Sequence, residues 1–343
     1  MTLESLSILW FVILGFFLAG YAMLDGFDLG VGILHPFIAR TDRERRISLN
    51  SIGPIWDGNE VWLIVYGGAL FAAFPEAYAT VFSGFYLAFM LALLGLMMRA
   101  VSLEFRGKIH SPGWRAVWDW AFFASSLLTT LIFGVAVGNS MIGVPLDARG
   151  LYTGTFLDLL TFYPILVALL TISMFALHGM LYLQLKTPAG PMHTRIENSA
   201  WYFWGVFFVL YIATSIVTLD TIPGAVANFQ HHPWSGIFVL VAILAIVNIA
   251  RSIRNKQPGQ AFLSSCVTIV SFVALFSLAL YPNIITSHPD HANSLTIFNA
   301  ASSQRTLRIM TIVGVLGTPL VLTYTLVVYW TFRGRVELDD HSY

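Results

Sequence analysis

Two acidic residues interrupt an otherwise apolar stretch of this chain. The stretch reads Trp56-Asp57-Gly58-Asn59-Glu60-Val61-Trp62, and an apolar run follows it as far as Phe74. Asp57 and Glu60 are three residues apart, so a helix would place both on one face. An ionised carboxylate in an apolar helix is costly unless it is protonated, paired or hydrated. The pair therefore indicates that the protein needs charge in a hydrophobic environment.

The composition of the whole chain is that of a membrane protein. Of its 343 residues, 57% are hydrophobic and 10% are charged, whereas a soluble domain carries roughly 25% charged residues. A mean hydropathy of +0.74 leaves no room for a large soluble domain. The formal net charge is zero, so we expect no nucleic-acid partner. The single cysteine, Cys266, rules out a disulfide framework within the chain.

Nine segments are long and apolar enough to cross a bilayer as helices, which takes about 20 residues each. They cover residues 5–36, 52–74, 79–101, 116–138, 159–184, 200–219, 236–252, 261–281 and 307–332. The sequence therefore predicts an all-α, polytopic membrane protein with nine transmembrane helices and short loops.

The positive charges of the loops predict how these helices are oriented. With the N-terminus outside, 15 of the 18 Lys and Arg residues fall on the cytoplasmic side, and only Arg149, Arg305 and Arg308 remain outside. Cytoplasmic loops carry the excess of Lys and Arg in membrane proteins. We therefore expect the N-terminus outside and the C-terminus in the cytoplasm.

Charged residues within the predicted helices gather in the first four helices, in their cytoplasmic half. They are Asp25, Asp28, Asp57, Glu60, Arg99, Glu104, Lys108 and Asp119. Burial and a neighbouring arginine shift carboxyl pKa values in opposite directions, so such a set can exchange protons near neutral pH. Acids that descend from the cytoplasm into a bundle predict a proton relay. A static buried network around Arg99 is the alternative.

The first predicted helix carries its acids among glycines, in the motif Asp25-Gly26-Phe27-Asp28-Leu29-Gly30-Val31-Gly32. Asp25 and Asp28 share a helix face, and Gly26, Gly30 and Gly32 allow another backbone or a bulky group to approach closely. The motif predicts either helix packing, with the aspartates bonded to neighbouring helices, or membership of the relay.

No residue pattern predicts a metal site or a catalytic centre in this chain. His35 and His178 are lone helical histidines without an evident second axial partner for haem. The pairs His231-His232 and His288/His291 fall in outer loops and are expected to be solvated turns. We therefore expect no cofactor ligated by this chain.

The motifs resemble subunit II of the cytochrome bd-type quinol oxidases. The match is dense over residues 20–140, looser afterwards, and covers most of the chain. Besides the two stretches quoted above, it rests on Gly67-Gly68-Ala69-Leu70-Phe71-Ala72-Ala73-Phe74-Pro75, Phe82-Ser83-Gly84-Phe85-Tyr86, Glu104-Phe105-Arg106-Gly107-Lys108, Trp118-Asp119-Trp120 and Val137-Gly138-Asn139.

The resemblance implies a bacterial inner-membrane complex that oxidises quinol, reduces dioxygen to water and contributes to the proton gradient. Haem b and haem d would belong to a larger subunit I, and this chain would support assembly with it. The implied architecture is a first four-helix bundle with the acidic motifs (residues 1–143), a second bundle (144–282), and a peripheral ninth helix with a cytoplasmic tail (283–343).

The resemblance also implies roles for particular residues and further partners. An apolar dioxygen route is expected near Trp62, while the residues themselves give Gly26, Gly30, Gly32 and Arg99 as candidates for helix packing. Some relatives hold a structural quinone in this subunit, so a structural quinone, membrane lipid and a small single-helix accessory subunit are candidate partners. A cytoplasmic proton pathway would use Lys108, Glu104 and Asp57, with Glu60, Asp25 and Asp28 as further candidates.

Two other functions stay open on the residues alone. An independent proton-coupled membrane transporter could use the same acids, but it typically shows broken helices, a midplane site and paired repeats. The acids here lie in one half of the chain, and no repeat is evident. A purely structural scaffold for a haem subunit is the third interpretation, with the acids only locking helices together.

Overall fold

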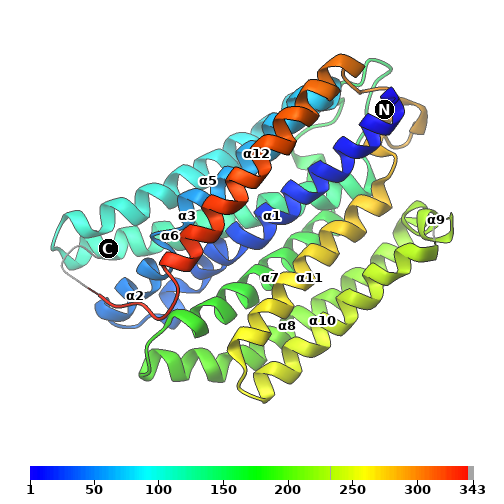
Figure 1. The fold of residues 1–343 in the computed structure, drawn as a ribbon. Helices are drawn as coiled ribbons and strands as arrows, with labels where there is room; N and C mark the ends of the chain where they lie inside the picture. Colours follow the sequence, from blue (N-terminus) through cyan, green and yellow to red (C-terminus); the bar gives the residue numbers. More distant parts are fainter. Residues whose placement is uncertain (232, 339–343) are drawn as a thin grey trace.

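The computed structural model describes residues 1–231 and 233–338, most of which are helical (Figure 1). The α-helices are α1 (Leu3–Ile38), α2 (Asp42–Ile52), α3 (Trp56–Ala73), α4 (Pro75–Gly84), α5 (Tyr86–Phe105), α6 (Pro112–Ile142), α7 (Phe162–Lys186), α8 (Pro191–Thr221), α9 (Pro223–His231), α10 (Gly236–Arg254), α11 (Pro258–Leu280) and α12 (Gln304–Thr331). Short elements complete the fold: the 3-10 turns η1 (Arg106–Lys108), η2 (Leu157–Leu159), η3 (Pro233–Ser235) and η4 (His291–Asn293), and the strands β1 (Asn283–Ile285) and β2 (Leu295–Thr296).

Eight helices in the described ranges are long and apolar enough to cross a membrane, so the all-α, multi-pass prediction is confirmed. The remaining predicted segment, 52–74, forms α3. It is not among the eight, because Asp57, Asn59 and Glu60 lower its mean hydropathy. The count of nine spanning helices and their division into two bundles stay predictions.

Helix α1 is the central element of the molecule. It packs against α3, α6, α7 and α11 (Figure 1), so the acidic motif in its C-terminal half faces helices on several sides. Helix α2 and the C-terminal end of α12 lie at one end of the long axis, which we call the α2 end. The N-terminus lies at the opposite end.

The backbones of α1 and α7 touch directly where they cross. A Cβ atom built on Gly30 would lie 1.9 Å from the carbonyl oxygen of Phe175, and one built on Gly179 would lie 2.5 Å from the carbonyl carbon of Gly30. On another side of α1, a Cβ on Gly32 would lie 2.0 Å from the Ser126 hydroxyl. Only glycine fits these positions without moving a helix.

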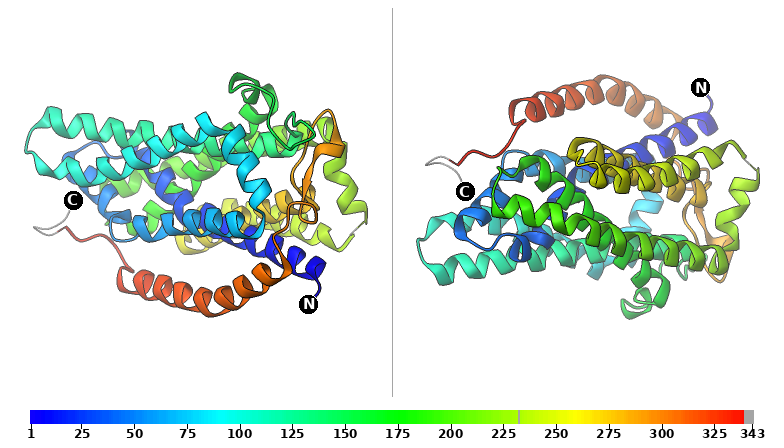
Figure 2. Two further views of the ribbon diagram at one scale, coloured as in Figure 1. Left: turned by 90° about the horizontal axis from the view of Figure 1, so that it is seen from above. Right: turned by 90° about the horizontal axis from the view of Figure 1, so that it is seen from below.

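Helix α12 lies at the periphery of the molecule, against α1 and α3. Figure 2 shows it as a bowed arc along the outside, and Pro319 lies within it. Near the N-terminal end, the Trp10 indole donates to the Leu307 carbonyl at 3.2 Å. At the α2 end, the Val336 N–H donates to the Lys186 carbonyl at 2.8 Å. Hydrogen bonds therefore tie this helix to the rest of the molecule near both ends.

Candidate functional site

One buried arginine joins three helices in the interior. Arg99 of α5 donates from Nη1 to Asp25 Oδ1 of α1 at 2.6 Å and from Nη2 to Glu60 Oε1 of α3. The side chains of Arg99 and Asp25 are fully buried, whereas that of Glu60 is 21% exposed. Glu60 therefore connects the buried ion pair with the surface.

A second buried acid lies beside this ion pair. Asp28 accepts a hydrogen bond from Asn59 Nδ2 at 2.8 Å, and Asn59 Oδ1 accepts one from the Tyr329 hydroxyl at 2.9 Å. These bonds connect α1, α3 and α12. Among the described residues, the second carboxylate oxygens of Asp25 and Asp28 are buried without a hydrogen-bond partner. Two carboxyl groups, of Asp25 and Glu60, thus pair with Arg99, and a third, of Asp28, is held by Asn59 one helical turn from Asp25.

The other predicted pathway residues lie on the surface of this chain. Asp57, Glu104 and Lys108 are all exposed. Asp57 begins an exposed stripe along α3, with a spacing of four and three residues, that continues through Val61, Ile64, Gly68 and Phe71. The structure therefore brings Asp25, Asp28, Glu60 and Arg99 together in the interior and leaves Asp57, Glu104 and Lys108 outside that cluster.

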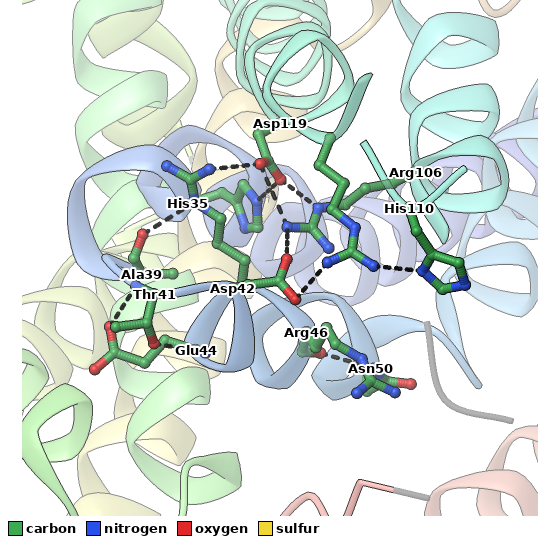
Figure 3. Close-up of polar contacts among 12 residues, drawn as sticks. His35, Ala39, Thr41, Asp42, Glu44, Arg46, Asn50, Arg106, His110 and Asp119 are labelled. Carbon is green, nitrogen blue, oxygen red and sulfur yellow. Dashed lines mark hydrogen bonds and ion pairs between the residues drawn. The ribbon is translucent and has the colours of Figure 1, made fainter. Parts of the chain in front are cut away.

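A separate polar network at the α2 end is centred on Asp119 of α6 (Figure 3). Its carboxylate accepts from His35 Nε2 at 2.7 Å, from Arg106 Nε at 2.6 Å and from Arg45 Nη1 at 2.7 Å. Asp119 is only 1% exposed. One buried carboxylate thus holds groups from α1, α2 and η1, and its negative charge is balanced by two guanidinium groups.

The network extends to the surface through Asp42 at the start of α2. Arg106 Nη2 donates to Asp42 Oδ1, and Arg115 Nη1 donates to Asp42 Oδ2, each at 2.9 Å. On the inner side, His35 Nδ1 bonds the Ser48 hydroxyl at 3.1 Å. The sequence interpretation noticed Asp119 and His35 but not their pairing, because 84 residues separate them. The signal in the sequence that could have indicated this network was Asp119, an acid within a predicted membrane helix that begins beside an Arg-rich loop.

Helix α2 is fixed at its first turn by Glu44. Thr41 Oγ1 accepts from the Glu44 N–H at 3.2 Å and Glu44 Oε2 accepts from the Thr41 N–H at 3.2 Å, which is a capping box. Glu44 also forms an ion pair with Arg195 of α8. Burial acts to raise the pKa of Glu44, but the bonds from Arg195 and from the Arg40 and Thr41 N–H groups outweigh it and lower that pKa.

In each of the buried histidines His35 and His178, both ring nitrogens form hydrogen bonds. Besides His35, His178 of α7 bonds the Ser265 hydroxyl at 2.7 Å and the Met23 carbonyl at 2.9 Å. Binding haem iron would break these bonds. Across the described ranges, no group of three or more His, Cys, Asp or Glu residues could hold a metal ion.

His231 is the last residue of helix α9 and not part of a turn as the sequence predicted, whereas His288 and His291 lie in the segment before α12. His231, His288 and His291 are exposed. The remaining member of the predicted pairs, His232, lies outside the described residues.

Comparison with known proteins assigns the chain to a family. The family model described as cytochrome bd terminal oxidase subunit II matches residues 6–332. The chain belongs to this family. As a subunit II of a bd-type oxidase, it is part of an oxidoreductase complex with a subunit I partner.

Relatives of this bd oxidase subunit match over nearly their whole length. Cytochrome bd-I ubiquinol oxidase subunit 2 of Escherichia coli is 37% identical, covering 98% of this chain and 97% of that protein. Cytochrome bd ubiquinol oxidase subunit 2 of Bacillus subtilis is 34% identical, covering 98% of each. A chain in the solved structure of bd oxidase from Geobacillus thermodenitrificans has the same fold, with a TM-score of 0.79 at 16% identity, covering 96% of this chain and 99% of that one.

An apolar cavity of about 430 Å³ lies in this bd oxidase subunit between α1, α3, α11 and α12. Its lining includes Trp62, whose indole N–H is buried without a partner among the described residues, and Tyr329, which bonds Asn59. The volume falls within the range of about 300–1,000 Å³ that is usual for ligand pockets. The dioxygen route near Trp62 and the structural quinone stay predictions.

Proposed function

We propose that this chain is the non-haem subunit II of a bd-type terminal oxidase that oxidises quinol and reduces dioxygen to water. Haem b and haem d would lie in subunit I, since His35 and His178 already use both ring nitrogens. The names of the relatives, which are ubiquinol oxidase subunits, support the reaction. This chain would supply an assembly surface and a route for protons.

The observation that carries the proton route is the sequence of acids from the surface inward. Asp57 is exposed, Glu60 lies one helical turn further along α3 and is partly exposed, and its partner Arg99 is fully buried together with Asp25. Titratable groups at these three depths allow a proton to pass from solvent toward the helix interior. Glu104 and Lys108 add two exposed titratable groups near the α2 end.

The direction of proton uptake follows from the proposed orientation. The Arg-rich loops lie at the α2 end, which would face the cytoplasm. Reduction of dioxygen consumes protons, and taking them from the cytoplasm while quinol releases its own protons outside builds a gradient without a pump. Acids concentrated toward one end of α1, α3 and α5 suit such a one-sided supply.

The test is substitution of the entry residues in the purified two-subunit complex. We expect Asp57→Asn and Glu104→Gln each to lower the rate of oxygen consumption with quinol and to change its pH dependence, because each variant removes a titratable group. Haem absorbance should stay at the wild-type level. Asp220→Asn, an exposed acid at the far end of α8, is the matched control.

Two results would contradict these proposals, one for the proton route and one for the assignment as an oxidase subunit. If both variants keep the wild-type turnover and pH profile, Asp57 and Glu104 do not conduct protons. If the tagged chain purifies alone and colourless under conditions that preserve complexes, without a larger haem-bearing subunit, the assignment as an oxidase subunit is wrong for this chain. No observation in the described residues favours the transporter over the oxidase.

A further inference from the structure

We propose that Asp119 is a positioning residue that holds the turn carrying Glu104 and Lys108, and that it acts through Arg106. The turn comprises residues 104–111, from the end of α5 through η1 to the start of α6. The inference rests on the proposed role of Glu104 and Lys108 in proton entry.

Arg106 is the buried anchor of this turn. It is 3% exposed, although it lies in a turn whose residues Glu104 and Lys108, two positions away on either side, are exposed. Its guanidinium makes two bonds to Asp119, from Nε at 2.6 Å and from Nη2 at 3.4 Å, and a third to Asp42 at 2.9 Å. A two-point contact between a planar guanidinium and a carboxylate fixes direction as well as distance.

Two further contacts attach the ends of the turn to α6. The Trp114 indole donates to the Phe105 carbonyl at 2.8 Å, and Arg115 Nη2 bonds His110 Nδ1 at 3.0 Å. Both contacts are exposed, and both tie the turn only to the helix that follows it. The Arg106–Asp119 contact is the buried one, and Asp119 also joins the turn to α1 and α2 (Figure 3).

The charge of Asp119 is what allows this packing. Two guanidinium groups, of Arg45 and Arg106, bond its carboxylate from α2 and η1, and the His35 ring bonds it from α1. Asp42 is a second acid in contact with Arg106, and it is shared with Arg115. If Asp119 were neutral, the guanidinium groups of Arg45 and Arg106 would repel each other around an uncharged side chain. Their separation would move η1.

A movement of η1 displaces both exposed titratable groups together. Glu104 and Lys108 are each two residues from Arg106, so they follow its backbone. Proton transfer needs donor and acceptor within hydrogen-bond reach, directly or through one water. A misplacement of about 1 Å can lower a rate about a hundredfold. The Asp119 network would therefore set the rate of proton entry without carrying protons itself.

The experiment compares Asp119→Asn and Arg106→Lys with the wild type in the purified two-subunit complex. We expect turnover with quinol to fall by up to about a hundredfold and its pH profile to shift, while the haem spectrum is unchanged. Asp119→Glu, which restores the charge, should recover part of the rate. Asp220→Asn should match the wild type. Arg106→Lys keeps a positive charge beside Asp119, so it tests the two-point contact even if Asp119→Asn lowers the yield of complex.

Parallel measurements on Glu104→Gln and Lys108→Met separate this inference from the proposed function. If these variants lose turnover while Asp119→Asn and Arg106→Lys keep the wild-type rate and pH profile, the positioning role is wrong and the proton route stands. If Glu104→Gln and Lys108→Met keep full turnover, the proton route through this turn fails, and the positioning role fails with it.

Discussion

The negative charge of Asp25 stabilises the interior because it pairs with the fully buried guanidinium of Arg99. Asp25→Asn keeps the size of the side chain but removes one of the two carboxylates that pair with the fully buried guanidinium and leaves Glu60. Breaking a buried ion pair costs about 3–5 kcal/mol. We expect a much lower yield of the haem-containing complex, measured as haem per membrane protein after purification. A normal yield with intact haem would show that this ion pair does not support assembly.

Gly30 provides a second test at the residue scale. Gly30→Ala places a methyl group against the Phe175 carbonyl, which must move, and we expect a loss of about 1–3 kcal/mol, seen as a lower unfolding temperature of the complex. Gly205 of α8 is the matched control, because a Cβ there meets no atom within 4 Å. Gly205→Ala should be neutral or stabilising by up to about 1 kcal/mol. Equal effects of the two variants would contradict the close α1–α7 contact.

At the scale of elements, the spanning helices could be predicted from the sequence far better than the short ones. Hydrophobic length indicated the long helices, but the predicted segment 79–101 begins inside α4 and ends inside α5. Pro75 starts a new helix, and the α-helical run ends at Gly84 before restarting at Tyr86. Helix α2 was missed because it is polar, although Thr41 and Glu44 carry the spacing of a capping box.

The candidate site was predicted in part, for a physical reason. Spacing within one helix indicated that Asp25 and Asp28 share a face. The positions of the acids along the predicted helices indicated that they gather in the cytoplasmic half. Neither could indicate that Arg99 bridges α1 and α3, or that His35 meets Asp119, because those contacts depend on how distant helices pack. Exposure of Asp57 and Glu104 likewise depends on which helix faces outward.

Helix α2 should be sensitive to acid because of Glu44. Its pKa is lowered in the folded protein, so its contribution to stability is complete above the ordinary value of 4.5 and is lost as the pH falls through the lower folded value. We expect the wild type to unfold at a higher temperature than Glu44→Gln at about pH 6–7, and the difference to shrink toward about pH 3. A difference that is constant over this range would mean that the Glu44–Arg195 pair does not stabilise α2.

At the scale of the whole molecule, the distribution of arginines predicts the orientation in the membrane. In a Cys266→Ser background, we expect a membrane-impermeant maleimide to label Asp290→Cys in intact cells and to leave Arg43→Cys unlabelled. Both positions are exposed and lie in loop or α2 segments at opposite ends of the fold. After the membrane is permeabilised, both should react. Labelling of Arg43→Cys alone in intact cells would reverse the proposed orientation and the direction of proton uptake.

The direct backbone contact between Gly30 and Gly179 has a mechanical consequence. Alternating access in a transporter requires one half to rock against the other, and shear between helices requires side-chain layers that slide. Helices α1 and α7, which the predicted division assigns to different bundles, have no such layer at their crossing. The contact therefore opposes sliding of α1 past α7 at this point, and such resistance suits a subunit that keeps its shape while a partner subunit carries out the chemistry.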